Sequence, residues 1–282
     1  MARFSFEIAR DFDVSTPLQL KTRISDGRVR IQGHDAAKAT IAVRLQVRAA
    51  SREEAETQVD RVVAGIVCTG EMLSIESPDA GFWRHGDLRA LYEILVPRQT
   101  RAELRLANGP LHLNNLAGPL EVHLDNGPMT IEGITEATSV HIVNGPLDVK
   151  DCESGVDISV VNGPLRVRKA KGPVTLDVTN GPIYVEDVDL GLKARVLNGV
   201  LTYRGPVGGD FDLTANNASL VLHLPWGSRF ELDAEAQRGS VESDFQVDEG
   251  APAPDGAHHL RLRAVQGNIR IAEIRRGAIA FA

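Results

Sequence analysis

Two histidines and one aspartate recur at multiples of a single spacing. An 18-residue step separates His123 from His141, and Asp177 follows after two further steps of the same length. In a chain with this period, these side chains would share one outward column. Imidazole and carboxylate groups can hold a metal or line a binding surface. The same column contains Ser159 and Arg195, a mixture that is equally typical of a solvated face. Because no third ligand follows at a fixed spacing, we predict surface binding at most and no metal site.

The sequence offers little for catalysis. It contains no nucleophile elbow, phosphate-binding loop or zinc motif. Glu121 and Asp157 could face one another across Ser139, but polysaccharide-cleaving enzymes need carboxylates that converge across a cleft. We therefore predict no catalytic residue, no cofactor and no enzymatic activity.

One aromatic segment is a second candidate for binding. Phe82 and Trp83 lie between two predicted strands, in the segment 80–85. An exposed Trp83 could anchor a partner. The alternative is that both rings fold back onto the neighbouring strands, since large aromatic side chains are mostly buried.

The elements that must position these residues are defined by a repeat. Asparagine returns with an 18-residue period and without insertion, most often followed by Gly-Pro. The column consists of Asn108, Asn126, Asn144, Asn162, Asn180, Asn198 and Asn216. A repeat this regular indicates identical structural units stacked on one another.

Between the asparagines, apolar residues alternate with polar ones. Leu120, Val122 and Leu124 form one such run, and Ile183 and Val185 form another. Alternation of this kind predicts strands with one buried face. Two short strands per repeat predict a mainly β fold, a parallel β-solenoid with 18-residue coils and two main strands per coil. Parallel crossovers favour a right-handed coil.

The asparagine column is explained by the corner between the two strands. Asparagine tolerates unusual turn conformations, glycine adopts backbone angles closed to other residues, and proline fits the first position of a strand. Stacked asparagines can also hydrogen-bond to one another as a ladder. We interpret the column as structural; the alternative is an edge that binds a ligand.

The regions flanking the repeat have different patterns. Residues 1–100 predict an α+β capping segment with one helix near 52–67, where Ser51 and Glu54 form a capping box. Residues 101–247 predict the solenoid, and residues 248–282 a loop and closing strands that form a C-terminal cap. Past Gly208 and Gly209 the alternation shifts by one residue, which predicts a bulge or an altered corner.

Composition and charge limit the partners. The net charge is −7, and no basic stripe suggests nucleic-acid binding. No apolar run is long enough to span a membrane. The first residues lack the apolar segment of a signal peptide, so we expect a cytoplasmic protein, or an extracellular one if a signal has been removed.

The order of these segments resembles a known family. The chain shows a strand turn at SDGRVRIQGHD, a capped helix, EILVPRQTRAELRLANGPLHL leading into NGPL repeats, and a closing LRLRAVQGNIRIAEI. This resembles the bacterial "putative adhesin" family of unknown function with β-strand repeats. The resemblance implies a β-solenoid and carries no catalytic residues.

Two functions follow as hypotheses. The first is a non-enzymatic, adhesin-like interaction scaffold whose partner is an unknown protein or polysaccharide. The alternative is a carbohydrate-binding or carbohydrate-active protein that uses the outward column of His123, His141 and Asp177. A homo-oligomer formed through the ends or an edge of the solenoid is also consistent with the pattern.

Overall fold

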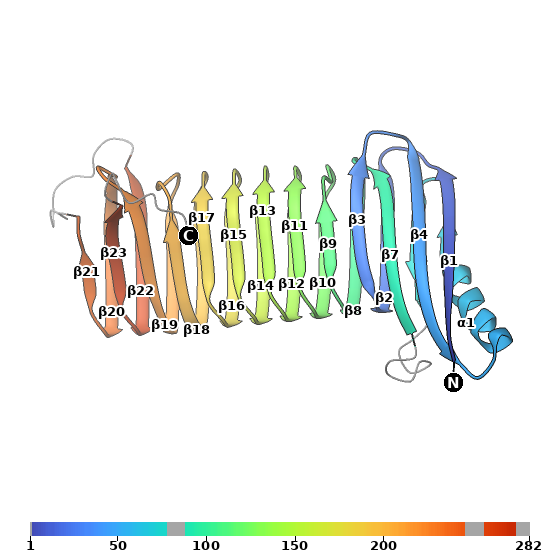
Figure 1. The fold of residues 1–282 in the computed structure, drawn as a ribbon. Helices are drawn as coiled ribbons and strands as arrows, with labels where there is room; N and C mark the ends of the chain where they lie inside the picture. Colours follow the sequence, from blue (N-terminus) through green and yellow to red (C-terminus); the bar gives the residue numbers. More distant parts are fainter. Residues whose placement is uncertain (1, 78–87, 246–256, 275–282) are drawn as a thin grey trace. The chain divides into compact units, whose positions relative to one another are not determined.

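The structure is a computed structural model that describes residues 2–77, 88–245 and 257–274. In these ranges the chain forms one α-helix and 23 β-strands (Figure 1). It divides into two compact units, residues 1–145 and 146–282. The fold is therefore mainly β, as the alternating pattern predicts.

The first unit contains the helix and the first 12 strands. Their bounds are β1 (Ala2–Asp13), β2 (Leu18–Asp26), β3 (Arg28–His34), β4 (Lys38–Ala49), α1 (Arg52–Ala64), β5 (Ile66–Cys68), β6 (Met72–Glu76), β7 (Leu88–Pro97), β8 (Thr100–Asn108), β9 (Leu111–Asn114), β10 (Leu120–Asn126), β11 (Met129–Ile134) and β12 (Thr138–Asn144).

The second unit contains the remaining strands. Their bounds are β13 (Leu147–Cys152), β14 (Val156–Asn162), β15 (Leu165–Ala170), β16 (Val174–Asn180), β17 (Ile183–Val188), β18 (Leu192–Arg204), β19 (Phe211–Pro225), β20 (Phe230–Arg238), β21 (Val241–Ser243), β22 (His258–Gln266) and β23 (Ile269–Ile274).

In each unit, strands that are one repeat apart pair in parallel. In the first unit, Leu104 of β8 pairs with Val122 of β10, which pairs with Val140 of β12. In the second unit, Ile158 of β14 pairs with Leu176 of β16. The paired aliphatic residues are buried, with exposed fractions of 2% or less. The hydrophobic effect thus acts on the same column in successive repeats.

The beginning of the chain does not follow sequence order in space. Strand β2 pairs in parallel with β6 on one side and with β8 on the other. Strand β3 pairs in parallel with β7 and with β9. The segment β2–β3 is therefore inserted between β6–β7 and the first Asn-Gly-Pro repeat.

Antiparallel strands and the helix complete the first unit. Strand β4 pairs antiparallel with β7, and β1 pairs antiparallel with β4. The helix α1 lies beside β1 and β4 in Figure 1 and contacts both. Its buried face consists of Ala55, Val59 and Val62.

The helix is shorter than the predicted range 52–67. The Ser51 hydroxyl accepts a hydrogen bond from the Glu54 backbone N–H at 3.2 Å, which confirms the cap. The helix ends at Ala64, however, because Ile66 and Cys68 join β5, which pairs antiparallel with β6. Among the described residues, no helix has the length and apolarity needed to cross a membrane.

The glycine pair in the second unit alters a corner, as predicted. Ala194 of β18 pairs with Leu213 of β19, a step that is one residue longer than the regular repeat. The added residue is accommodated between the two strands, where Gly208 and Gly209 lie. A Cβ atom on Gly209 would approach the Leu190 carbonyl carbon to 2.6 Å.

Within the predicted C-terminal cap, residues 248–282, the described strands β22 and β23 are not the outermost ones. Strand β22 pairs in parallel with β19 on one side and with β20 on the other. Strand β23 likewise pairs with β19 and β21. The closing strands are therefore inserted (Figure 1), and β20–β21 are the outer strands. The pattern of burial gives the reason: Leu260 and Leu262 are fully buried, whereas Leu232 of β20 is only partly buried.

Candidate functional site

The asparagine column forms the expected side-chain hydrogen bonds within each unit. In the first unit, Asn126 donates to Asn108 at 3.1 Å, and Asn144 donates to Asn126 at 2.9 Å. The Asn108 amide donates to the Ser25 carbonyl, so the inserted segment β2–β3 takes part. Because these donors are used within the column, the arrangement fits a structural role better than a ligand-binding one.

The second unit repeats the arrangement and corrects one member of it. Asn180 donates to Asn162, and Asn198 donates to Asn180, both at 2.8 Å. The next donor, at 3.2 Å, is Asn217 instead of the predicted Asn216. The reason is the altered corner, since the longer step places Asn217 opposite Asn198.

The predicted binding column of His123, His141 and Asp177 consists of locally partnered groups. The rings of His123 and His141 stack, with centroids 4.8 Å apart, and His123 Nε2 lies 2.9 Å from Asp125 Oδ1. In the second unit, Asp177 Oδ2 lies 3.9 Å from Arg195 Nη1. No group of three His, Cys, Asp or Glu residues that could hold a metal occurs among the described residues. Trp83 lies outside the described residues.

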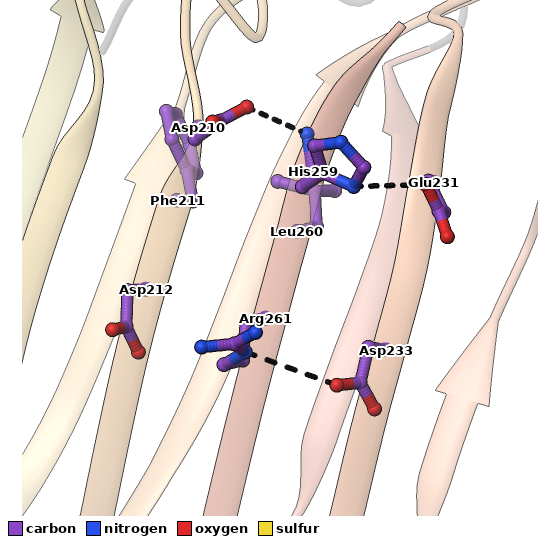
Figure 2. Close-up of a pocket in the computed structure, with 8 residues that line it drawn as sticks. All are labelled: Asp210, Phe211, Asp212, Glu231, Asp233, His259, Leu260 and Arg261. Atoms are coloured by element: carbon purple, nitrogen blue, oxygen red, sulfur yellow. Dashed lines mark hydrogen bonds and ion pairs between the residues drawn. The ribbon is translucent and has the colours of Figure 1, made fainter. Parts of the chain in front are cut away.

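A polar depression of about 390 Å³ in the second unit was not predicted from the sequence. Figure 2 shows that its side chains come from three neighbouring strands, β19, β22 and β20, and from the residue that precedes β19. The acidic residues are Asp210, directly before β19, Asp212 of β19, and Glu231 and Asp233 of β20. Strand β22 contributes His259, Leu260 and Arg261, and Phe211 of β19 completes the lining.

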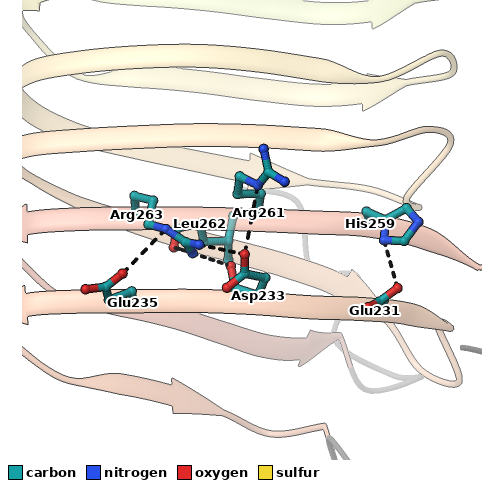
Figure 3. A network of polar contacts seen from close by, with 7 residues as sticks. All are labelled: Glu231, Asp233, Glu235, His259, Arg261, Leu262 and Arg263. Carbon is teal, nitrogen blue, oxygen red and sulfur yellow. Dashed lines mark hydrogen bonds and ion pairs between the residues drawn. The ribbon is translucent and has the colours of Figure 1, made fainter. Parts of the chain in front are cut away.

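Charges of opposite sign alternate across these strands. On strand β22, His259, Arg261 and Arg263 lie in register with Glu231, Asp233 and Glu235 of β20 (Figure 3). His259 Nδ1 lies 2.8 Å from Glu231 Oε2, and the His259 backbone N–H donates to Asp210 Oδ1 at 2.9 Å. We call the residues Glu231, Asp233, Glu235, His259, Arg261 and Arg263 the charge network.

The centre of the charge network is Asp233. Arg263 Nη2 lies 2.6 Å from Asp233 Oδ2, and Arg261 Nε lies 3.9 Å from the same oxygen. Arg263 Nε lies 3.6 Å from Glu235 Oε2. The hydrogen bond from Arg263 lowers the pKa of Asp233 below its usual range and raises the pKa of Arg263.

The direction of its pKa shift makes Asp233 unsuited to act as a general acid. A general acid needs a carboxyl with a raised pKa, whereas Asp233 is held ionised by its partners. The partnered carboxylates instead serve the pairing of three strands. The sequence signal for this network was a pair of matching patterns. Acidic residues occupy every second position at 231, 233 and 235, and basic residues occupy every second position at 259, 261 and 263.

Comparison with known proteins gives fold-level likeness only. No family model matches the chain, and no curated protein sequence matches it. A solved "putative cell adhesion protein" from Clostridium sporogenes covers 96% of this chain and 100% of its own, at 11% identity and a TM-score of 0.25. A solved "putative adhesin" from Bacteroides fragilis covers 95% and 97%, at 12% identity and a TM-score of 0.38. These names agree with the resemblance noted in the sequence, but the low scores carry no argument about activity.

Proposed function

We propose that this protein is a non-enzymatic, adhesin-like interaction scaffold built as a right-handed parallel β-solenoid. Parallel pairing at 18-residue steps within each unit supports coils of two strands, and right-handed crossovers are the general rule for parallel strands. The partner is a protein or a polysaccharide that contacts several coils at once.

The observation that carries this proposal is the alignment of outward side chains in rows. In the first unit, Glu103 pairs with Glu121, which pairs with Ser139. In the second, Asp157 pairs with Thr175, which pairs with Lys193. Each row advances by one strand spacing, about 4.8 Å. Such rows suit an extended partner, as in other repeat proteins.

Hydrogen exchange during binding tests the scaffold. The purified chain would be mixed with surface polysaccharides and proteins fractionated from its native host, and the protected peptides mapped. We expect protection that recurs at 18-residue intervals over at least three coils, with the partner recovered chemically unchanged. Protection confined to one coil, or cleavage of the partner, would contradict the proposal.

An open strand edge supports self-association as part of the same proposal. Strand β20 pairs with β22, and no other strand within residues 2–77, 88–245 and 257–274 pairs with it. An unpaired edge can pair with another chain. Light scattering over a concentration series should show oligomers, and a strictly monomeric protein at all concentrations would exclude this part.

A further inference from the structure

A second depression, of about 570 Å³, lies on a different set of strands in the second unit. We call its outward-facing residues the arginine face, and they lie in two rows across β15, β17, β18 and β19. One row is Arg166, Tyr184 and Thr202; the other is Arg168, Glu186, Arg204 and His223.

The arginine face contains two arginines that form no close ion pair in the described part of the chain. Within the described part of the chain, neither Arg166 nor Arg204 has a carboxylate within 4.0 Å. Arg168 is different, because its Nη2 donates to both carboxylate oxygens of Asp148 at 3.0 and 2.9 Å. Counting Glu186 and Asp148 against the three arginines, the charge of this surface is about +1, on a chain whose net charge is −7. The surface therefore attracts anions although the chain as a whole is acidic.

An exposed aromatic ring stands between these cations. Tyr184 is 47% exposed, and the guanidinium carbon of Arg166 lies 5.9 Å from its ring centroid. An aromatic ring offers an apolar surface with a polar tip, and this suits the alternating C–H and hydroxyl faces of a sugar. The hydroxyl of Thr202 and the carboxylate of Glu186 line the same depression and can hydrogen-bond to sugar hydroxyls.

The spacing of the rows fits an extended ligand. Arg166 of β15 and Arg204 of β18 lie in different rows and are separated by β17, so their strands lie two strand spacings apart, about 10 Å. A guanidinium group binds a carboxylate with two parallel hydrogen bonds. A chain of sugar rings that carries carboxylates can therefore contact both arginines and the Tyr184 ring together.

We propose that the arginine face binds an acidic polysaccharide, a chain of sugars that carry carboxylates. This rests on the proposed scaffold function and specifies its partner. Arg204 and Arg166 bind the carboxylates, and Tyr184 stacks against a sugar ring. Thr202 and Glu186 form hydrogen bonds with sugar hydroxyls. An acidic peptide could pair with the arginines, but it has no sugar ring to stack against Tyr184.

Calorimetry with three probes tests the proposal. Oligogalacturonate carries both sugar rings and carboxylates, its methyl ester is a neutral chain of the same rings, and polyglutamate carries carboxylates without sugars. We expect saturable binding of oligogalacturonate that weakens as salt is added. The ester and polyglutamate should each bind at least tenfold more weakly.

Three variants locate the binding. Arg204→Gln should weaken oligogalacturonate binding about tenfold, because a charged hydrogen bond is lost. Tyr184→Ala should weaken it about fivefold through loss of stacking. Arg195→Gln is the matched control, since Arg195 lies on the same strand but in a different row beside Asp177, and its binding should be unchanged. Equal thermal unfolding of all variants shows that each is folded.

Several results would overturn the inference. Absence of oligogalacturonate binding would do so, as would wild-type affinity in both Arg204→Gln and Tyr184→Ala. Equal binding of polyglutamate, unaffected by Tyr184→Ala, would show a general anion surface or an acidic-peptide site. If periodic protection by a host partner appeared on other rows, the scaffold function would stand while this inference fails.

Discussion

Each unit contains a pair of strands inserted out of sequence order, but the two insertions are stabilised differently. In the first unit, β2–β3 lie between β6–β7 and β8–β9, and the outer strands are buried, with Ile75 and Ile94 each 1% exposed. In the second, β22–β23 lie between β19 and β20–β21, and the outer residue Val241 is 42% exposed. The outer strands beside the first insertion are covered by other elements, whereas those beside the second are partly exposed and carry the acidic side of the charge network.

The register of an inserted strand can be specified in two ways. Burial fixes which residues of a strand face inward, because a shift of one residue would expose the apolar set. Charge complementarity helps to select the neighbouring strand, because the basic residues of β22 are attracted to the acidic residues of β20. The second mechanism is weaker and responds to pH and salt.

The largest expected effect concerns the glycines that seat the inserted strands. A Cβ atom on Gly109 would lie 2.0 Å from the Gly27 carbonyl oxygen, and one on Gly267 would lie 2.0 Å from the Ala218 carbonyl oxygen. Gly109→Ala and Gly267→Ala should each reduce the free energy of unfolding by about 3 kcal/mol or more, through overpacking and backbone strain. Urea denaturation measures this.

Gly227→Ala is the control for these two variants. Gly227 also has a positive φ, of 75°, but a Cβ atom there would meet nothing within 4 Å. Gly227→Ala should reduce the free energy of unfolding only through backbone strain at a positive φ, by about 1 kcal/mol. Equal losses of unfolding free energy at Gly109, Gly267 and Gly227 would show that the close backbone approach at Gly109 and Gly267 adds no cost to substitution.

The next largest expected effect is the loss of stability when a leucine is truncated, which depends on how deeply that leucine is buried in each unit. Leu20 of the inserted β2 is fully buried, whereas Leu232 of the outer strand β20 is partly exposed. Leu20→Ala should cost about 3 kcal/mol and Leu232→Ala about 1 kcal/mol. Native-state hydrogen exchange should also show β20 opening more readily than β6. Similar losses for both variants would remove the distinction between the units.

Two buried tyrosines should respond with opposite signs. The hydroxyl of Tyr92 in the first unit is buried and has no hydrogen-bond partner in the part of the chain that the structure describes. The hydroxyl of Tyr203 in the second unit donates to the Pro206 carbonyl. Tyr92→Phe should therefore stabilise the protein by about 1 kcal/mol, and Tyr203→Phe should destabilise it by a similar amount.

Thermal unfolding of both tyrosine variants checks this pair. Each substitution removes one oxygen from a side chain that is fully buried, so the packing change is matched. Destabilisation by Tyr92→Phe would mean that its hydroxyl is hydrogen-bonded in solution.

The same contrast explains what the sequence could predict. The strands, their inward residues and the asparagine column follow from period and alternation, since every repeat meets the same constraints. The insertion of β22 could not be predicted that way, because alternation in 258–266 and in 230–238 is equally good. It depends on which strand neighbours which, a long-range choice made by burial of Leu260 and Leu262 and by the charges of Asp233 and Arg263.

The asparagine column shows a smaller failure of the same kind. Counting by the regular period identifies Asn216, although the shift at Gly208 and Gly209 was visible in the alternation. Carrying that shift forward by one residue would have identified Asn217. The arginine face could not be predicted, because sequence does not show which of its arginines lack a carboxylate partner.

The smallest expected effect tests the charge network directly. Asp233→Asn keeps the shape of the side chain and removes its charge. Asp233 is largely exposed, with a side-chain accessibility of 59%, so solvent screening limits the loss at neutral pH to about 0.5 kcal/mol. Asp157→Asn is the control, because Asp157 is exposed on β14 in the same unit and should show no loss.

The dependence of this loss on pH follows from the direction of the pKa shift. The pKa of Asp233 is lower in the folded protein than its ordinary value of 3.8, so its ionised form favours folding. Its contribution is complete at pH values well above 3.8, and it disappears as the pH falls through the lowered pKa. The unfolding curves of wild type and Asp233→Asn, measured by urea denaturation, should therefore differ at pH 7 and converge in acid. A difference that persists in acid would show that Asp233 acts through packing, and the second insertion would then resemble the first.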